Sequence, residues 1–163
     1  MHNAFSQKTE GRFNFLITDV VIKCNGKEVK IKGLWDTGAS KSAIDLTVIS
    51  HLGLQPVDKI SIGTADGVKA LKNQYILEEV LLPNNVIVPT LQATEANISG
   101  QGIHMLVGMD IISMGNFSIT HKKPTGMTFS FSVPPFGSEV DYVQRINDDV
   151  SAKRKEKKKK RKK

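Results

Sequence analysis

Two strand-like runs joined by a two-residue turn constrain the fold of this chain more than any other feature. The first run is Arg12–Lys23 (RFNFLITDVVIK) and the second is Glu28–Trp35 (EVKIKGLW). Asn25-Gly26 lies between them, and this dipeptide is a strong hairpin signal because both residues accept positive φ. The hairpin therefore places the next residue, Asp36, at the far end of an apolar strand.

The same strand-like pattern continues along the chain. A second hairpin is expected over residues 60–71, with its turn at Thr64-Ala65-Asp66-Gly67, and a third over residues 116–135, ending at Pro134-Pro135. The strands between them are short and numerous. The sequence therefore predicts an all-β domain with one or two short helices.

Two short helices are indicated by their capping residues. Residues 45–53 (DLTVISHLG) carry Asp45 as a candidate N-cap and Gly53 at the C-terminal end. A second helix is expected after Gly108, with Asp110 as its N-cap and Gly115 beyond its last turn. Further on, a sequence resembling a capping box, Ser138 to Asp141, precedes a possible amphipathic helix.

The net charge of +7 belongs to the end of the chain. Residues 153–163 contain ten Lys or Arg and one Glu, so the first 152 residues carry 13 basic and 15 acidic side chains. We divide the chain into an N-terminal leader (1–11), a folded domain (12–136) and a C-terminal extension (137–163). The basic end, Lys153–Lys163, is expected to be disordered. It is either a solubilising tail or a nonspecific contact to nucleic acid or an anionic membrane.

The single cysteine, Cys24, cannot form an intrachain disulfide, which suits a reducing compartment. The sequence contains neither an apolar run of membrane-spanning length nor a basic and apolar leader. We therefore expect a cytoplasmic location. The four histidines are scattered and form no metal-binding spacing, so no metal or other cofactor is expected.

Asp36 opens an Asp-Thr-Gly triplet, and burying its charge at a strand end would be costly without compensation. The triplet alone has two interpretations. It is a common turn sequence, in which Asp36 would close an Asx-turn. It is also suited to presenting a carboxylate for chemistry, and its context favours this second interpretation. Leu34-Trp35 precede it, Ala39-Ser40 follow it, and Leu106-Val107-Gly108 occur about seventy residues later.

This arrangement resembles the retropepsin-like aspartic proteases over residues 12–122. The resemblance implies a closed β-barrel equivalent to half of pepsin. It also implies a C2 homodimer in which Asp36 from each copy forms the catalytic pair, because each chain supplies one Asp-Thr-Gly. The two carboxylates would activate a water molecule that attacks the peptide bond.

By the same resemblance, other residues support the site. Thr37 would hydrogen-bond the loop of the partner copy, Gly38 would donate its N–H to the carboxylate, and Ala39 would follow in the same loop. Gly108 would belong to the second motif, which packs beneath that loop. Ala65, Asp66 and Gly67 fall where the family has its flap, an assignment that depends on position and turn chemistry alone.

Three features depart from the family pattern. Trp35 is larger than the usual aliphatic residue before the catalytic Asp and is expected to narrow a neighbouring space. Met109 stands where retroviral enzymes often have Arg, so that ion pair is missing. Asp110 offers a second carboxylate for a monomeric enzyme, although N-capping explains it without catalysis.

Two functions of different class follow from these features. The first is an aspartic endopeptidase that acts on peptide or protein substrates through Asp36 and the Asp36 of a second copy. The alternative is a retropepsin-fold module that dimerises or binds peptides with little or no proteolysis. The intact Asp-Thr-Gly favours the endopeptidase, since a scaffold has no evident need for an unneutralised carboxylate at its interface.

Overall fold

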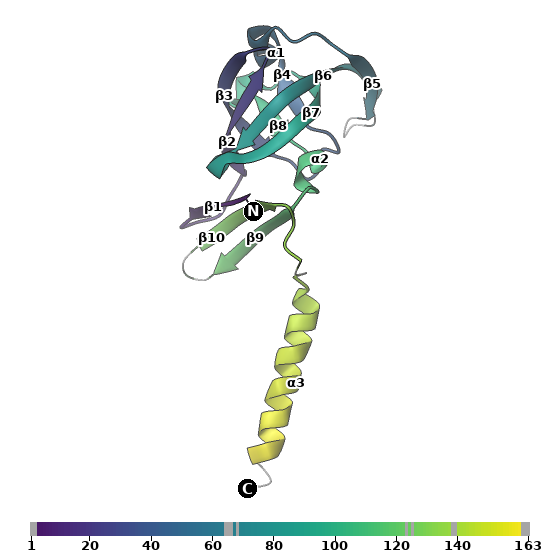
Figure 1. The fold of residues 1–163 in the computed structure, drawn as a ribbon. Helices are drawn as coiled ribbons and strands as arrows, with labels where there is room; N and C mark the ends of the chain where they lie inside the picture. Colours follow the sequence, from purple (N-terminus) through teal and green to yellow (C-terminus); the bar gives the residue numbers. More distant parts are fainter. Residues whose placement is uncertain are drawn as a thin grey trace.

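The computed structural model describes residues 3–63, 67, 69–122, 124, 126–137 and 140–160, with side chains as far as Lys153. Strands dominate the described chain (Figure 1). The elements in chain order are β1 (Asn3–Thr9), β2 (Ile17–Cys24), β3 (Lys27–Trp35), β4 (Ala43–Asp45), α1 (Leu46–Leu52), β5 (Asp58–Gly63), β6 (Lys69–Leu82), η1 (Pro83–Asn85), β7 (Val86–Ala96), η2 (Ser99–Gln101), β8 (Met105–Val107), α2 (Met109–Ile112), β9 (Asn116–Lys122), β10 (Gly126–Val133) and α3 (Tyr142–Lys160).

Six strands form a closed barrel in the order β2, β3, β8, β4, β7 and β6, and β2 also pairs with β6. The pairs β3–β8 and β4–β7 are parallel, whereas the other pairs are antiparallel. β6 has 14 residues and is long enough to pair with β2 near one end and with β5 near the other. The prediction of an all-β closed barrel with short helices is confirmed.

The first hairpin forms as the sequence predicts. Asn25 and Gly26 have φ values of 52° and 69°, and the flanking pair is Cys24 and Lys27. Positive φ at both turn residues matches the right-handed twist of the strands. On β2, Val20 and Ile22 point into the barrel and are fully buried. The alternation of buried and exposed residues on β2 sets which side chains of the paired strand β3 point into the barrel. It therefore also sets where Asp36 leaves the barrel.

A second, three-stranded sheet lies beneath the barrel and consists of β1, β10 and β9 in that order (Figure 1). We call it the terminal sheet. β1 pairs with β10 from Asn3–Val133 to Thr9–Met127. Most of the segment set apart as a leader therefore forms a paired strand of this sheet. Apolar packing helps to hold β1 in this sheet, because the rings of Phe5 and Phe129 pack edge to face, with centroids 5.6 Å apart.

The predicted caps of α1 are confirmed and those of α2 are wrong. Asp45 caps α1, and Gly53 ends it in the left-handed conformation with φ 66°. α2 begins after Gly108 as expected, but no side chain caps it, and Asp110 lies inside its first turn. Gly115 does not end the helix; a Cβ there would lie 1.8 Å from the Ser132 carbonyl oxygen, so close packing against β10 requires glycine.

α3 extends away from the terminal sheet and continues through most of the basic segment (Figure 1). The Asp141 carboxylate accepts hydrogen bonds from the N–H groups of Val143 and Gln144 and thus caps the helix; Ser138 lies outside the described residues. α3 runs as far as Lys160, into the segment for which the sequence predicts disorder, and Lys, Arg and Glu are good helix formers. Along the described chain, no helix is long and apolar enough to cross a membrane.

Candidate active site

Asp36 emerges from the barrel where β3 ends beside β8. Leu34 and Trp35 pair with Leu106 and Val107 in parallel register, and the Asp36 N–H donates to the Val107 carbonyl at 3.0 Å. The apolar residues before Asp36 thus belong to the barrel wall, whereas the Asp36 side chain is partly exposed. The strand end accordingly presents a carboxylate to solvent without burying its charge.

The residues after Asp36 form a tight loop, which we call the Asp36 loop (residues 36–42). The Gly38 N–H donates to Asp36 Oδ1 at 2.8 Å, and the Ala39 N–H donates to the Asp36 carbonyl at 3.2 Å. A Cβ on Gly38 would lie 3.2 Å from Asp36 Oδ1, so glycine permits this approach. Thr37 and Gly38 are exposed. The loop therefore orients one carboxylate oxygen and leaves Thr37 accessible.

Gly108 lies where the Asp36 loop crosses the segment after β8. A Cβ at Gly108 would lie 2.6 Å from the Lys41 carbonyl carbon and 2.9 Å from the Ala39 carbonyl oxygen. Next to it, the Met109 N–H donates to the same Ala39 oxygen at 2.8 Å. The two segments are thus in backbone contact, and Met109 contributes to this contact through its main-chain N–H.

Trp35 anchors the other side of the loop. Its indole N–H donates to Thr18 Oγ1 at 3.0 Å inside the barrel. Its ring packs against four phenylalanines of the terminal sheet, with centroid distances between 4.9 and 6.0 Å: Phe131, Phe129, Phe5 and Phe117. Such contacts contribute about 0.5–1.5 kcal/mol each beyond burial. Trp35, the residue before Asp36, therefore joins the barrel to the terminal sheet.

Asp110 lies inside the first turn of α2, where Gly108 holds the N-cap position, and its carboxylate binds the end of the Asp36 loop. Its two carboxylate oxygens accept hydrogen bonds from the N–H and the hydroxyl of Ser42, at 2.9 and 2.6 Å. The explanation of Asp110 as an N-cap is therefore wrong. Both oxygens are engaged, which also weighs against Asp110 as a second catalytic carboxylate.

The projecting hairpin predicted over residues 60–71 is confirmed as β5 and β6, which pair from Asp58–Gln74 to Gly63–Lys69. Gly67 is exposed, with φ 81°, whereas Ala65 and Asp66 lie outside the described residues. The base of the hairpin is held to β7 by Glu95, which accepts hydrogen bonds from the N–H and the side-chain amide of Asn73.

Two carboxylates, the buried Asp45 and the partly buried Glu95, have lowered pKa values. Burial raises the pKa of Asp45, but hydrogen bonds from Thr47, Ile98 and Ser99 outweigh it and hold the pKa well below its ordinary value. Burial likewise raises the pKa of Glu95, and hydrogen bonds, chiefly from Asn73, bring it below the usual range. Both groups therefore stay ionised in mild acid.

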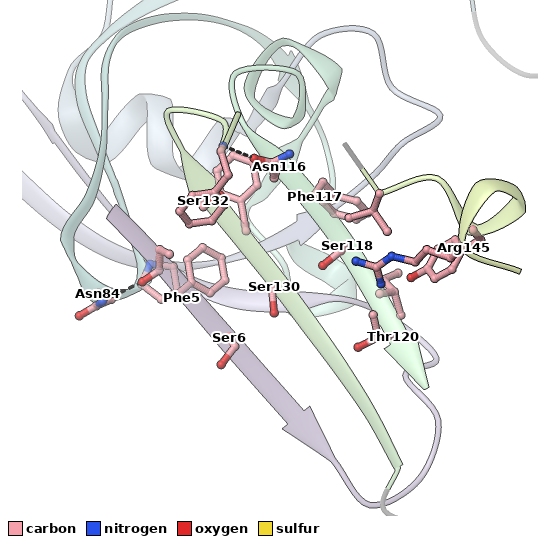
Figure 2. A pocket seen from close by; sticks show the side chains of 17 residues that line it. Phe5, Ser6, Asn84, Asn116, Phe117, Ser118, Thr120, Ser130, Ser132 and Arg145 are labelled. Carbon is pink, nitrogen blue, oxygen red and sulfur yellow. Dashed lines mark hydrogen bonds between the residues drawn. The ribbon is translucent and has the colours of Figure 1, made fainter. Parts of the chain in front are cut away.

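One cavity of about 1140 Å³ lies over the terminal sheet (Figure 2). Serines of the sheet, including Ser6, Ser118 and Ser130, line it together with Phe136 and Arg145. None of its lining residues belongs to the Asp36 loop, so it is separate from the candidate site. Within the described ranges, no group of three or more His, Cys, Asp or Glu side chains is arranged to hold a metal ion.

The structure brings four of the predicted site residues together, namely Asp36, Gly38, Ala39 and Gly108, and leaves Thr37 exposed in the same loop. Sequence reasoning missed Ser42, which is fully buried and hydrogen-bonded to Asp110. It lies in no motif, and a serine six residues after Asp36 gives no signal by itself.

A family model described as "Aspartyl protease" matches residues 20–111, which include Asp36 and Gly108. A search of curated proteins gives no match. The match to the family model covers more than half of the 163 residues and contains both segments of the site.

Among solved structures, the chain is similar to a retropepsin-like aspartic protease from Rickettsia conorii, with a TM-score of 0.50 and 17% identity, covering 82% of this chain and 93% of that chain. It is also similar to the retroviral protease-like domain of Ddi1 from Leishmania major, with a TM-score of 0.43 and 16% identity, covering 72% and 95%. A foamy viral protease-reverse transcriptase in complex with an RNA/DNA hybrid matches with a TM-score of 0.44 and 19% identity, covering 61% of this chain and 12% of that chain.

Proposed function

The chain belongs to the aspartyl protease family, and from this premise we propose that it is an aspartic endopeptidase that works as a homodimer. The observation that carries the proposal is the Asp36 loop. It presents a partly exposed carboxylate with one oxygen fixed by the Gly38 N–H at 2.8 Å. The other oxygen, Oδ2, accepts no hydrogen bond from the described residues and is available for a water molecule or a second carboxylate.

The chemistry requires two carboxylates that share one proton. The ionised one removes a proton from water, and the protonated one donates a hydrogen bond to the carbonyl of the scissile bond. One chain supplies one Asp36, and Asp110 is occupied by Ser42. The second carboxylate is therefore assigned to Asp36 of another copy, related by a two-fold axis.

The surrounding residues support this assignment. Thr37 is exposed beside Asp36 and can hydrogen-bond a partner loop across the two-fold axis. The β5–β6 hairpin is assigned as the flap that closes over an extended peptide substrate and excludes water. A cytoplasmic location is likewise proposed, on the ground of the single free cysteine.

Incubation of a denatured protein mixture with wild-type enzyme or with Asp36→Asn tests the proposal, with cleavage sites identified by mass spectrometry. Wild type is expected to produce new peptide ends, and Asp36→Asn none, because the amide keeps the shape of the side chain and removes the base. Equal cleavage by both proteins contradicts the role of Asp36. No cleavage by a folded, dimeric wild type favours a binding module.

A further inference from the structure

The Asp36 loop ends at Ser42, the first buried residue after Asp36. Ser42 is 0% exposed, and all of its polar groups are engaged. Its N–H and hydroxyl donate to the two oxygens of Asp110, and its hydroxyl oxygen accepts the Gly108 N–H at 3.0 Å. Its carbonyl accepts the Thr94 N–H at 3.0 Å. The end of the loop is thus fixed in three directions.

Three attachments connect the Asp36 loop to residues 107–110. The first joins the Asp36 N–H to the Val107 carbonyl, and the second joins the Met109 N–H to the Ala39 carbonyl. The third is the Ser42 cluster with Gly108 and Asp110. Between Ala39 and Ser42 the loop is exposed. Without the third attachment, only the bonds at Asp36 and Ala39 would join the loop to residues 107–110.

The chemistry of this third attachment suits an aspartate. Ser42 offers two donors side by side, and a carboxylate offers two oxygens that only accept. Asp110 Oδ1 also accepts the Ile111 N–H at 3.0 Å, so its oxygens receive three donors. Hydrogen bonds to an ionised acceptor are about twice as strong as neutral ones. Asparagine at this position would turn an NH2 group toward a donor.

We propose that Ser42 and Asp110 form a positioning pair that sets the geometry of Asp36 for catalysis. This inference rests on the proposed proteolytic function and deepens it. Neither residue is assigned a contact with substrate or with the reacting water. They act through the loop, by fixing its end against the segment that also receives the Asp36 N–H.

The test compares Asp110→Asn and Ser42→Ala with a matched control, Asp45→Asn. Asp45 is also a buried carboxylate that accepts several hydrogen bonds, but its partners are Thr47, Ile98 and Ser99 and not the Asp36 loop. For each folded, dimeric variant, kcat and KM are measured with one fluorogenic peptide. Hydrogen exchange is measured at the amides of Ala39 and Met109.

Both pair variants are expected to lower kcat by about 10- to 100-fold while KM changes by less than about threefold, because misplaced groups lose transition-state stabilisation. The Ala39 and Met109 amides should exchange faster. The double variant should lose no more kcat than the more impaired of the two single variants, since the two residues act as a unit. Asp45→Asn should lower stability and leave kcat and these amides unchanged.

Unchanged kcat and unchanged amide exchange in both pair variants would overturn the inference. An equal loss of kcat in Asp45→Asn would also overturn the inference, because the loss of kcat would then result from lower stability and not from a displaced Asp36 loop. If wild type itself cleaves nothing, the proposed function fails, and the exchange measurement still decides whether the pair holds the loop.

Discussion

Replacement of Gly108 by alanine is expected to displace the Asp36 loop, because two backbone segments cross at Gly108 without room for a side chain. The new Cβ would lie 2.6 Å from the carbonyl carbon of Lys41 and 2.8 Å from its oxygen. Nonbonded carbon atoms prefer about 3.5–4.0 Å. The Lys41 backbone must therefore retreat by about 1 Å, since neither contact is with a flexible side chain.

This displacement should affect both stability and catalysis. Overpacking of this kind costs about 1–3 kcal/mol of unfolding free energy. For a chain of this size, each kcal/mol lowers Tm by roughly 2–4 °C. A shift of about 1 Å in the loop that carries Asp36 should lower kcat by on the order of 100-fold, which is more than the loss of stability alone would produce.

The assay measures Tm by calorimetry and kcat with a fluorogenic peptide, at a temperature where every variant is folded. Gly100→Ala is the matched control, because a Cβ at Gly100 meets no atom within 4 Å. The control should behave as wild type. A Gly108→Ala protein with wild-type Tm and kcat would refute the view that this crossing needs glycine and fixes the catalytic loop.

Three further predictions concern pH, the tail and the loop. Asp45→Asn should lower the unfolding free energy by about 2–3 kcal/mol at pH 7. Because the folded pKa of Asp45 is depressed, this difference should shrink as pH falls below about 4; a constant difference in pH-dependent urea melts would contradict it. Removal of Lys153–Lys163 should leave cleavage of a short neutral peptide unchanged and weaken retention on heparin; loss of cleavage would show that the tail serves the site. Ala39→Ser should move the acidic limb of the pH–rate profile to lower pH, since a hydroxyl that hydrogen-bonds the Asp36 carboxylate stabilises its charged form. An acidic limb that stays in place or moves to higher pH would count against such a hydrogen bond.

The features that could be predicted from the sequence depend on local chemistry. Asn25-Gly26 requires positive φ, so the first hairpin and the position of Asp36 followed directly. Asp45 and Gly53 satisfy the ends of a helix in between, and the structure places them there. In each case, residues a few positions apart determine the conformation, and one sequence is enough to identify it.

The features that could not be predicted join distant segments. Ser42 and Asp110 are 68 residues apart. N-capping offers a plausible local explanation of Asp110, and no local pattern identifies Ser42. Trp35 was expected to narrow a space, yet it fills the contact between the barrel and Phe5 near the N-terminus. Such partners are set by the closed barrel and the terminal sheet, which a local pattern does not encode.

The most direct test of the shared catalytic pair is a mixing experiment between wild type and Asp36→Asn. The two proteins are combined at a constant total concentration and allowed to exchange subunits. If each active site needs Asp36 from both copies, mixed dimers are inactive. Activity per wild-type chain should then fall in proportion to the wild-type fraction, to about one tenth with a ninefold excess of Asp36→Asn. Constant activity per wild-type chain would contradict a site shared between two copies.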